Sequence, residues 1–478
     1  MGWRALTSRI LAGLLLVAPT ADATCGGGGG GGLGGISGDD AGSREVYRVP
    51  WKVLEEGLPA GDLKLLWMPG SAIEARSSDL LESRYLTLMA GECVGFALLP
   101  PKHPTRVAIA PSGSTVVITD RAGREVARLA DAGHELKPGA VEKLLRGELA
   151  KRKDALERRL DEAAALAKKD ADGAATAYGA VWEERCLFPS LAKRAAKALD
   201  KLGRPVDESS AVERPAPGLD DATGAAVEGE IRAGLAAEGT LTLDEARIRY
   251  ENATRLDPND PVALRFLAEF HRHHSGDWTE ARRLFGRVLA LGADPVSRAV
   301  ALHGLGKMTI HAGDFARGLD LFEQSIAAWP LPLTYRNLAV YWFSERQFAR
   351  AQGYMEKALA LAPEDPYNRI FAAVYLVGMG KPEEAKRIAL ASEGMVEASY
   401  NLAAIWAQLG DREKTLELLA RHFYAYERYE AVRAREMQEA RDDFVFASLH
   451  RDPAFVELTR DAIRDLDSYH RSGGEGRE

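Results

Sequence analysis

The stretch LHGLGKMTIHAGDFARGLDLFEQSIAAWP, residues 302–330, decides the fold of this 478-residue chain. Its apolar residues recur at helical spacing on both sides of a Gly-Asp pair, which predicts two amphipathic helices joined by a tight turn. Gly306 and Gly318 stand where larger side chains would hold the two helices apart, and a proline stops the second helix. We therefore expect a closely packed helix pair.

The same pattern recurs along the chain at a nearly constant interval. Gly306 and Gly318 are 12 residues apart, and so are Ala339 and Ala351 at the corresponding places of the next segment. The small residues near the start of each second helix follow at steps of 35, 37, 33 and 34 residues: Ala246, Ala281, Gly318, Ala351 and Ala385. Such a period is typical of stacked helix pairs, each of which buries its apolar side only against its neighbours.

This pattern closely resembles the tetratricopeptide repeat (TPR) family. The resemblance covers roughly six units and implies a mainly α fold, an α-solenoid whose stacked helical hairpins form a superhelix with a concave groove. We place the TPR superhelix at residues 225–428 and a C-terminal helical cap at 429–470. Four apolar residues of the cap are expected to cover the last open face: Phe446, Leu449, Phe455 and Leu458.

Residues 44–136 alternate strand-like and helical patterns, which predicts a small α/β domain. Buried strands are predicted at 62–69 and 93–100, with a helix between them and a hairpin over 114–130. The order of elements and the segment STVVITDRAGREVARL resemble the thioredoxin-like fold, and Trp67 stands where that family has an aromatic residue before its redox motif. Another kind of small α/β domain is the alternative.

The resemblance stops at the redox motif. WMPGSAIE (67–74) has no cysteine where thioredoxins carry their pair. Cys93 falls in a predicted core strand, where desolvation raises the pKa of a thiol and makes it inert, so the domain is expected to be redox-silent. Cys93 and Cys186 could pair in an oxidising compartment, but two lone, buried cysteines are the favoured interpretation.

Two segments separate this domain from the superhelix. Residues 137–202 predict a helical segment that resembles a further TPR-like hairpin, with a second helix that ends at a proline. Residues 203–224 are rich in Pro, Ser, Asp and Gly, which predicts a linker.

The first residues predict export. A basic start, a short apolar run and a small-x-small site indicate a signal peptide at 1–23, followed by a Gly-rich tether at 24–43. Cys25 at this boundary resembles the lipidated cysteine of a bacterial lipoprotein, which would anchor the protein to a membrane in the periplasm or cell envelope. A periplasmic or secreted protein without the lipid, and a cytosolic protein, are the alternatives.

The sequence offers little chemistry for catalysis. A net charge of −8 argues against general nucleic-acid binding. The cluster FHRHH (270–274) has no acidic or cysteine partner at ligand spacing, so we expect surface histidines and no metal site. No nucleophile, phosphate-loop or metalloprotease motif occurs, and we expect no catalytic residues, no cofactor and no enzyme activity.

The predicted groove is the remaining candidate site. Basic and amide side chains on the first helix of each unit could bind the carboxylates or backbone of a peptide, and a solvated helix face is the alternative for each of them: Arg265, His303, Lys307, Arg336, Asn337 and Asn401. The leading hypothesis is an exported, membrane-anchored scaffold or adaptor that binds protein partners. The alternatives are a thiol oxidoreductase in which Cys93 works and the repeats recruit substrate, and a purely structural envelope protein.

Overall fold

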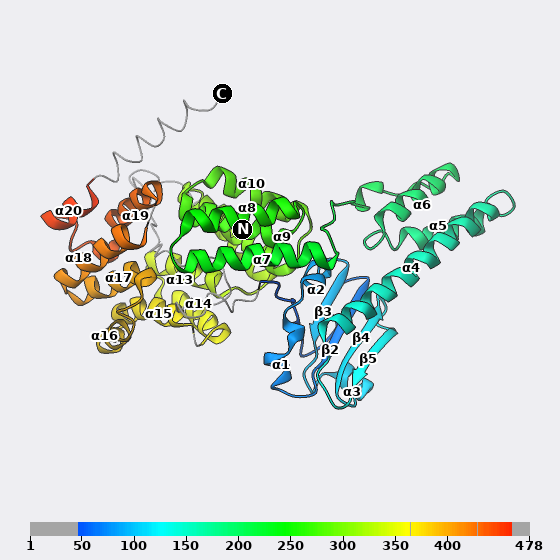
Figure 1. The fold of residues 1–478 in the computed structure, drawn as a ribbon, viewed down its shortest axis with the longest axis horizontal. Helices are drawn as coiled ribbons and strands as arrows, with labels where there is room; N and C mark the ends of the chain where they lie inside the picture. Colours follow the sequence, from blue (N-terminus) through cyan, green and yellow to red (C-terminus); the bar gives the residue numbers. More distant parts are fainter. Residues whose placement is uncertain (1–45, 364, 428, 461–478) are drawn as a thin grey trace, which may run out of the picture.

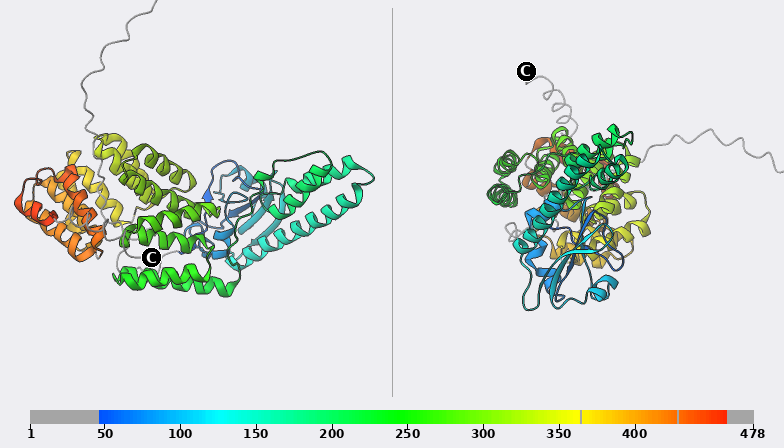
Figure 2. Two further views of the ribbon diagram at one scale, coloured as in Figure 1. Left: turned by 90° about the horizontal axis from the view of Figure 1, so that it is seen from above. Right: turned by 90° about the vertical axis from the view of Figure 1, so that its right-hand side faces the viewer.

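The computed structural model describes residues 46–363, 365–427 and 429–460. Figure 1 and Figure 2 show three parts: a β-sheet domain in the middle, a helical arm on one side and a large array of helices on the other. The predicted signal peptide, the tether and Cys25 lie outside the described residues. Among the helices that are described, none combines the length and the apolar character that a membrane span requires.

Five strands form one mixed sheet in the order β1-β3-β2-β4-β5. β1, β3 and β2 run parallel, whereas β4 is antiparallel to β2 and β5 is antiparallel to β4. β2 and β3 are buried along their whole length, as their mainly apolar sequences predict. The strands are β1 (Lys52–Val53), β2 (Leu63–Met68), β3 (Val94–Leu98), β4 (Ser114–Asp120) and β5 (Glu125–Asp131).

The predicted strands and hairpin are confirmed, with ends that differ by one or two residues. The helix expected between β2 and β3 is divided into η1 (Asp79–Leu81) and α2 (Arg84–Met89). Two serines divide it, because the hydroxyl of Ser78 accepts from the N–H of Leu80 and that of Ser83 accepts from Leu86, and each starts a new helix. Two further short helices complete the domain: α1 (Glu74–Ser77) and α3 (Pro104–Ile109).

The arm is built from α4 (Pro138–Leu166), α5 (Ala171–Trp182) and α6 (Pro189–Lys201). The first turns of α4 pack on the sheet, and its later turns join a separate apolar cluster with α5 and α6. The sequence predicted a second helix that ends at a proline, but Pro189 begins a third one. Proline suits the first turn of a helix because its missing N–H would have no partner there.

A disulfide joins Cys93, just before β3, to Cys186, in the loop between α5 and α6. The prediction of two lone, buried cysteines is therefore wrong: Cys93 is half-buried and Cys186 is exposed. The bond spans a sequence separation of 93 residues and ties the middle of the arm back to the sheet domain. Spacing alone could not predict this pairing, because α4 first carries the chain away from the sheet and α5 then brings it back (Figure 1).

The array begins inside the predicted linker, which also contains η2 (Glu208–Ser210). Asp220 caps the first helix by accepting from the N–H of Thr223, so the helix starts a few residues earlier than expected. Six helix pairs follow: α7 (Asp221–Gly239) with α8 (Leu243–Leu256), α9 (Pro261–Phe270) with α10 (Trp278–Ala290), α11 (Pro295–His311) with α12 (Phe315–Ala328), α13 (Pro332–Ser344) with α14 (Phe348–Leu361), α15 (Pro366–Gly378) with α16 (Pro382–Ala391), and α17 (Ser399–Leu409), after η4 (Val396–Ala398), with α18 (Arg412–Arg421).

The close approach predicted for residues 302–330 is confirmed. A Cβ atom on Gly306 would lie 3.1 Å from the carbonyl oxygen of Gly318, and a Cβ on Gly318 would lie 2.9 Å from that of Gly306. The two backbones therefore touch where α11 crosses α12, which only small residues permit. In the last pair Thr415 takes this place, fully buried, because its hydroxyl donates to the backbone oxygen of Asp411 at 2.7 Å.

Two π-helical turns interrupt the regular pattern: η3 (His271–Ser275) extends α9, and η5 (His422–Tyr426) extends α18. Beyond η5 the chain forms α19 (Glu430–Asp442), η6 (Phe444–Phe446) and α20 (Pro453–Thr459). The four apolar residues expected to cover the last pair belong to the same core cluster as Leu418 of α18 or pack against it.

A buried polar cluster fixes the sheet domain to the first repeats; we call Tyr47, Arg84, Asp257 and Asp260 the docking cluster. Arg84 Nη2 lies 2.7 Å from Asp257 Oδ2 and 2.9 Å from Asp260 Oδ2. The hydroxyl of Tyr47 donates to Asp260 Oδ2 at 2.7 Å, while Oδ1 caps α9 by accepting from the N–H groups of Val262 and Ala263. Each charge in this cluster has a partner.

Candidate functional site

The first helices of successive pairs form the inner face of the array. α9 packs on α11, α13 packs on α15, and α15 packs on α17. Helices that pack on the next repeat in this way line the concave side of a superhelix, which repeat proteins of this architecture use for binding.

The chain's own C-terminal segment, residues 429–446, lies against this face. The ring of Tyr429 meets that of Phe270 at the end of α9, with centroids 6.4 Å apart and planes at 89°. The guanidinium carbon of Arg435 lies 3.6 Å from the centroid of the Trp278 ring at the start of α10. These contacts join two parts of the chain that are more than a hundred residues apart.

Further along the segment, the contacts reach the third and fourth pairs. Glu439 Oε1 lies 3.1 Å from His311 Nδ1 at the end of α11. The ring of Phe444 lies 5.4 Å from that of Phe343 at the end of α13. The C-terminal segment therefore follows the inner face across three successive pairs, with its contacts at the ends of their first helices.

The six predicted groove residues are on the expected helices, but most of them are not exposed. Arg265, His303, Arg336 and Asn401 are buried, and Lys307 and Asn337 are half-buried. The expectation that these residues form a solvent-facing basic and amide surface is therefore wrong. Segments outside the repeats contribute to the burial, as Val46 does beside Arg265. The role of the six residues in partner binding stays a prediction.

Internal partners engage several of these side chains. Arg336 Nη1 lies 3.0 Å from Asp365 Oδ2 and donates to Asn368 Oδ1 at 2.7 Å. Arg265 donates to the backbone oxygen of Val46 at 3.2 Å, next to the docking cluster. These arginines stabilise the stacking of repeats and the seat of the sheet domain.

Two of the remaining predicted residues also have local contacts. His303 Nδ1 lies 3.1 Å from the hydroxyl of Thr334, and Asn337 donates to the backbone oxygen of Leu333 at 2.9 Å. Burial lowers the pKa of His303 well below its usual value, so this side chain is neutral near pH 7. The structure does not bring the six residues together as one site.

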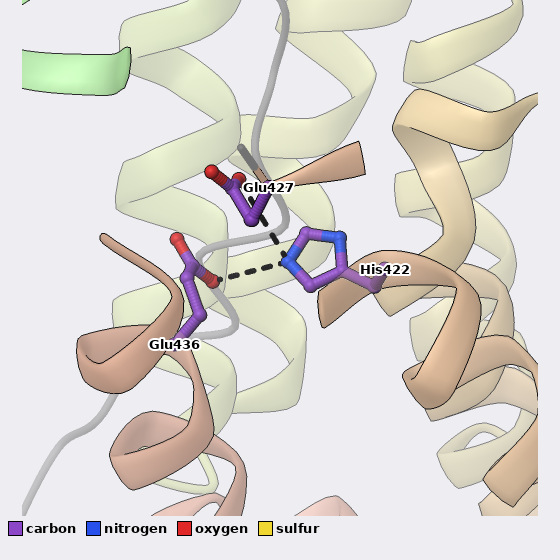
Figure 3. Close-up of side chains that lie close together, drawn as sticks. All are labelled: His422, Glu427 and Glu436. Atoms are coloured by element: carbon purple, nitrogen blue, oxygen red, sulfur yellow. Dashed lines mark ion pairs between the residues drawn. The ribbon is translucent and has the colours of Figure 1, made fainter. Parts of the chain in front are cut away.

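A different cluster gathers under the C-terminal segment: His422 in η5, Glu427 in the loop that follows, and Glu436 in α19 (Figure 3). His422 Nε2 lies 3.6 Å from Glu436 Oε2 and 4.0 Å from Glu427 Oε1. The exposed fractions of the residues are 0%, 7% and 2% for His422, Glu436 and Glu427. We call these three residues the His-Glu-Glu cluster.

The electrostatics of the cluster are unfavourable. Burial, and then the nearby Glu436 carboxylate, raise the pKa of the Glu427 carboxyl well above its usual value. Lys307 is the first of three cations that act in the opposite direction; the others are Arg433 and Arg435. Lys307 is thus a predicted groove residue whose charge acts on this cluster.

The sequence drew attention to the histidines of FHRHH and not to His422. The FHRHH cluster was expected at the surface, but His273 and His274 are buried. The π-helical turn places the histidines of this cluster differently from an α-helix. Two of them have separate contacts: His274 Nε2 lies 3.1 Å from Glu238 Oε1, and His271 Nδ1 lies 3.0 Å from Ser275 Oγ. No local motif marks the His-Glu-Glu cluster, since its residues lie five and nine positions apart.

The period, the paired helices and the small residues at their crossings resemble those of tetratricopeptide repeats. No family model matches the chain. It is 31% identical over 121 residues to the protein CTR9 homolog of Arabidopsis thaliana, covering 24% of this chain and 11% of that relative. It is 31% identical over 87 residues to photosystem I assembly protein Ycf3 of Rippkaea orientalis, covering 18% of this chain. The chain spans 11% and 50% of the lengths of these two curated relatives.

Two solved structures are also similar. Pseudomonas aeruginosa PilF matches with a TM-score of 0.30 and 17% identity, over 46% of this chain and 99% of that one. YrrB, described as a TPR protein with an unusual peptide-binding site, matches with a TM-score of 0.24 and 21% identity, over 40% of this chain and 97% of that one.

Proposed function

We propose that this protein is a scaffold that binds a helix-forming segment of a protein partner on the inner face of its helical array. The observation that carries the proposal is the position of the C-terminal segment, which lies on that face as a ligand would. An intramolecular ligand of this kind keeps the face covered until a partner displaces it. Recognition of a helix in a groove is a common mode of peptide binding.

The contacts of the C-terminal segment define the chemistry that a partner would reproduce. Tyr429 supplies an aromatic ring to Phe270, Arg435 supplies a cation to the face of Trp278, and Glu439 supplies a carboxylate to His311. The three groups lie on or next to one helix, so a competing partner would carry an aromatic residue, an arginine and an acid at helical spacing.

The sheet domain fits a thioredoxin-like domain without redox function. Support comes from the strand order, with three parallel strands followed by an antiparallel hairpin and a helix. Where a redox pair would follow β2, the chain instead has the turn at Gly70, whose N–H donates to the buried carboxylate of Glu74 at 2.6 Å. The disulfide at Cys93 lies before β3, at the opposite end of the parallel strands.

Export to the periplasm or cell envelope, with an N-terminal lipid anchor on Cys25, is part of the same proposal. The Cys93–Cys186 disulfide supports it, because such bonds persist in oxidising compartments. The alternative, a thiol oxidoreductase, would need the Cys93–Cys186 disulfide to open during the reaction, so that a thiolate forms at Cys93.

The test uses a fluorescent peptide with the sequence of residues 429–443 and the full chain. A variant carrying Tyr429→Ala, Arg435→Ala and Glu439→Ala loosens the chain's own segment while leaving the inner face intact. We expect the peptide to bind this variant and not the wild type, because the tethered segment competes at an effective concentration of about millimolar. Fluorescence anisotropy measures the binding.

Two controls make this result specific. A peptide in which Arg435 and Glu439 are exchanged has the same composition and should not bind. Adding Trp278→Ala to the loosened variant should weaken binding of the native peptide. If neither chain binds the peptide, or if the exchanged peptide binds equally well, the inner face is not a binding site of this kind.

A further inference from the structure

We propose that His422, Glu427 and Glu436 form a binding site for a divalent metal ion of the first transition row, with Zn²⁺ as the representative. Figure 3 shows the three side chains turned toward one another. Their candidate ligand atoms all lie within 4.8 Å of one another. The inference is independent of peptide binding on the inner face.

The donor set fits such an ion. One imidazole nitrogen and two carboxylate oxygens are ligands that zinc and its neighbours accept, and three protein ligands leave a position for water. With bonds of about 2.1 Å, tetrahedral ligands stand about 3.4 Å apart. The separation of 3.6 Å between His422 Nε2 and Glu436 Oε2 is close to this value. The separation of 4.0 Å between His422 Nε2 and Glu427 Oε1 would have to shorten by about half an ångström, which a small side-chain rotation can provide.

The second observation is that these buried groups are unsatisfied. Among the described residues, neither ring nitrogen of His422 has a hydrogen-bond partner, and the same holds for Glu427 Oε1 and Glu436 Oε2. Buried polar atoms are nearly always hydrogen-bonded, because leaving water without a new partner is costly. The gaps of 3.6 Å and 4.0 Å are too long for hydrogen bonds, but an ion placed between the atoms would bond to all three.

Charge also favours a cation. When both carboxylates are ionised they carry a charge of −2, which one divalent ion neutralises. Lys307, Arg433 and Arg435 already compensate part of it. Within the described part of the chain, His422 Nδ1 also lacks the hydrogen-bond acceptor that usually orients a metal-bound histidine. We therefore expect a site of moderate affinity.

The position of the ligands gives the ion a structural consequence. His422 belongs to the π-helical turn at the end of the last helix pair, whereas Glu436 belongs to α19. Single π-helical turns are frequent at functional sites. An ion bound here would fasten the C-terminal segment to the array.

The experiment titrates Zn²⁺ into the untagged full chain, stripped beforehand with a chelator, and follows binding by calorimetry. We expect one ion per chain, and at least about tenfold weaker binding in His422→Gln and Glu436→Gln. Glu430→Gln is the matched control, since this carboxylate is on the same helix but is exposed to solvent. It should bind Zn²⁺ as the wild type does, and so should His271→Gln.

Two outcomes would overturn the proposal: no Zn²⁺ binding by the wild type, or binding that His422→Gln leaves unchanged, which would indicate adventitious sites. A measurement on the wild type alone avoids dependence on how the variants fold. Hydrogen exchange of residues 430–442 should slow on addition of Zn²⁺ and recover with chelator. Exchange that does not respond to the metal also contradicts the site.

Discussion

The docking cluster and the His-Glu-Glu cluster are both buried and charged, but they differ in how fully their polar atoms are hydrogen-bonded. In the docking cluster, Arg84 pairs with two carboxylates, and Asp260 also accepts hydrogen bonds from Tyr47 and from the N-terminus of α9. In the His-Glu-Glu cluster, both ring nitrogens of His422 lack a hydrogen-bond partner among the described residues.

The difference separates two uses of buried charge. Removing ions from water is costly, and a cluster that satisfies each ion internally holds parts of the structure together. A cluster whose polar atoms lack hydrogen-bond partners adds little to stability, and these atoms are available to bind a ligand. Mutations in the two clusters should therefore have very different effects on the free energy of unfolding.

The largest effect is expected for Arg84→Met. It leaves Asp257 and Asp260 buried without their cation, which should lower the free energy of unfolding by about 3–5 kcal/mol. Guanidinium unfolding followed by tryptophan fluorescence measures the change. Arg124→Ala is the control, since Arg124 is 82% exposed in its pair with Asp120 and should contribute less than about 1 kcal/mol. Equal effects of the two variants would remove the distinction between docking and surface pairs.

Tyr47→Phe should have the next largest effect. It keeps the buried ring but removes the hydroxyl that donates to Asp260 at 2.7 Å, so we expect a loss of about 1.5–3 kcal/mol, as for other hydrogen bonds to charged groups. The same unfolding measurement applies. In the Arg84→Met background the loss should change, because the two side chains share one carboxylate; strict additivity would contradict a single cluster.

A smaller effect should come from pH, through His303 on the inner face. Burial lowers its pKa well below the usual value, so the folded chain keeps it neutral while the unfolded chain takes up a proton below about pH 6.5. The unfolded state then binds more protons, and stability falls as the pH decreases, by up to about 1.4 kcal/mol per unit for this residue.

Unfolding curves between pH 7 and pH 5 measure this dependence. His303→Gln should show a shallower slope than the wild type. His134→Gln, which changes an exposed histidine, should keep the wild-type slope. If His303→Gln does so too, another group is responsible.

The smallest effect is expected for Glu436→Gln in chelator-treated protein. The carboxylate Oε2 has no hydrogen bond to lose among the described residues, and its repulsion of Glu427 disappears, so the free energy of unfolding should change by less than about 1 kcal/mol. A loss as large as that of Arg84→Met would show that the His-Glu-Glu cluster is a structural ion pair.

The sequence predicted features that local patterns determine. The helix pairs, their turns and the contact of Gly306 with Gly318 follow from a period near 34 residues, and the strands follow from continuous apolar runs. Each of these depends on residues close together in the chain, for which spacing and residue type are sufficient evidence.

The features that were not predicted depend on distant contacts. The return of Tyr429 to Phe270 and the pairing of Cys93 with Cys186 join residues that no period connects. The π-helical turns also change which side of a helix a histidine occupies, so the interpretation of FHRHH failed. The burial of Arg265 and Arg336 follows from such long-range packing, whereas the sequence placed them only on their helices.

The Cys93–Cys186 bond also changes what a break in the polypeptide would mean. The turn between β4 and β5 is accessible: the side chains of Arg121 and Arg124 are 54% and 82% exposed. A trypsin-like protease that cuts there acts between the two cysteines, so both fragments stay covalently joined. The cut protein would migrate as one species on a denaturing gel until a reductant separates the two fragments.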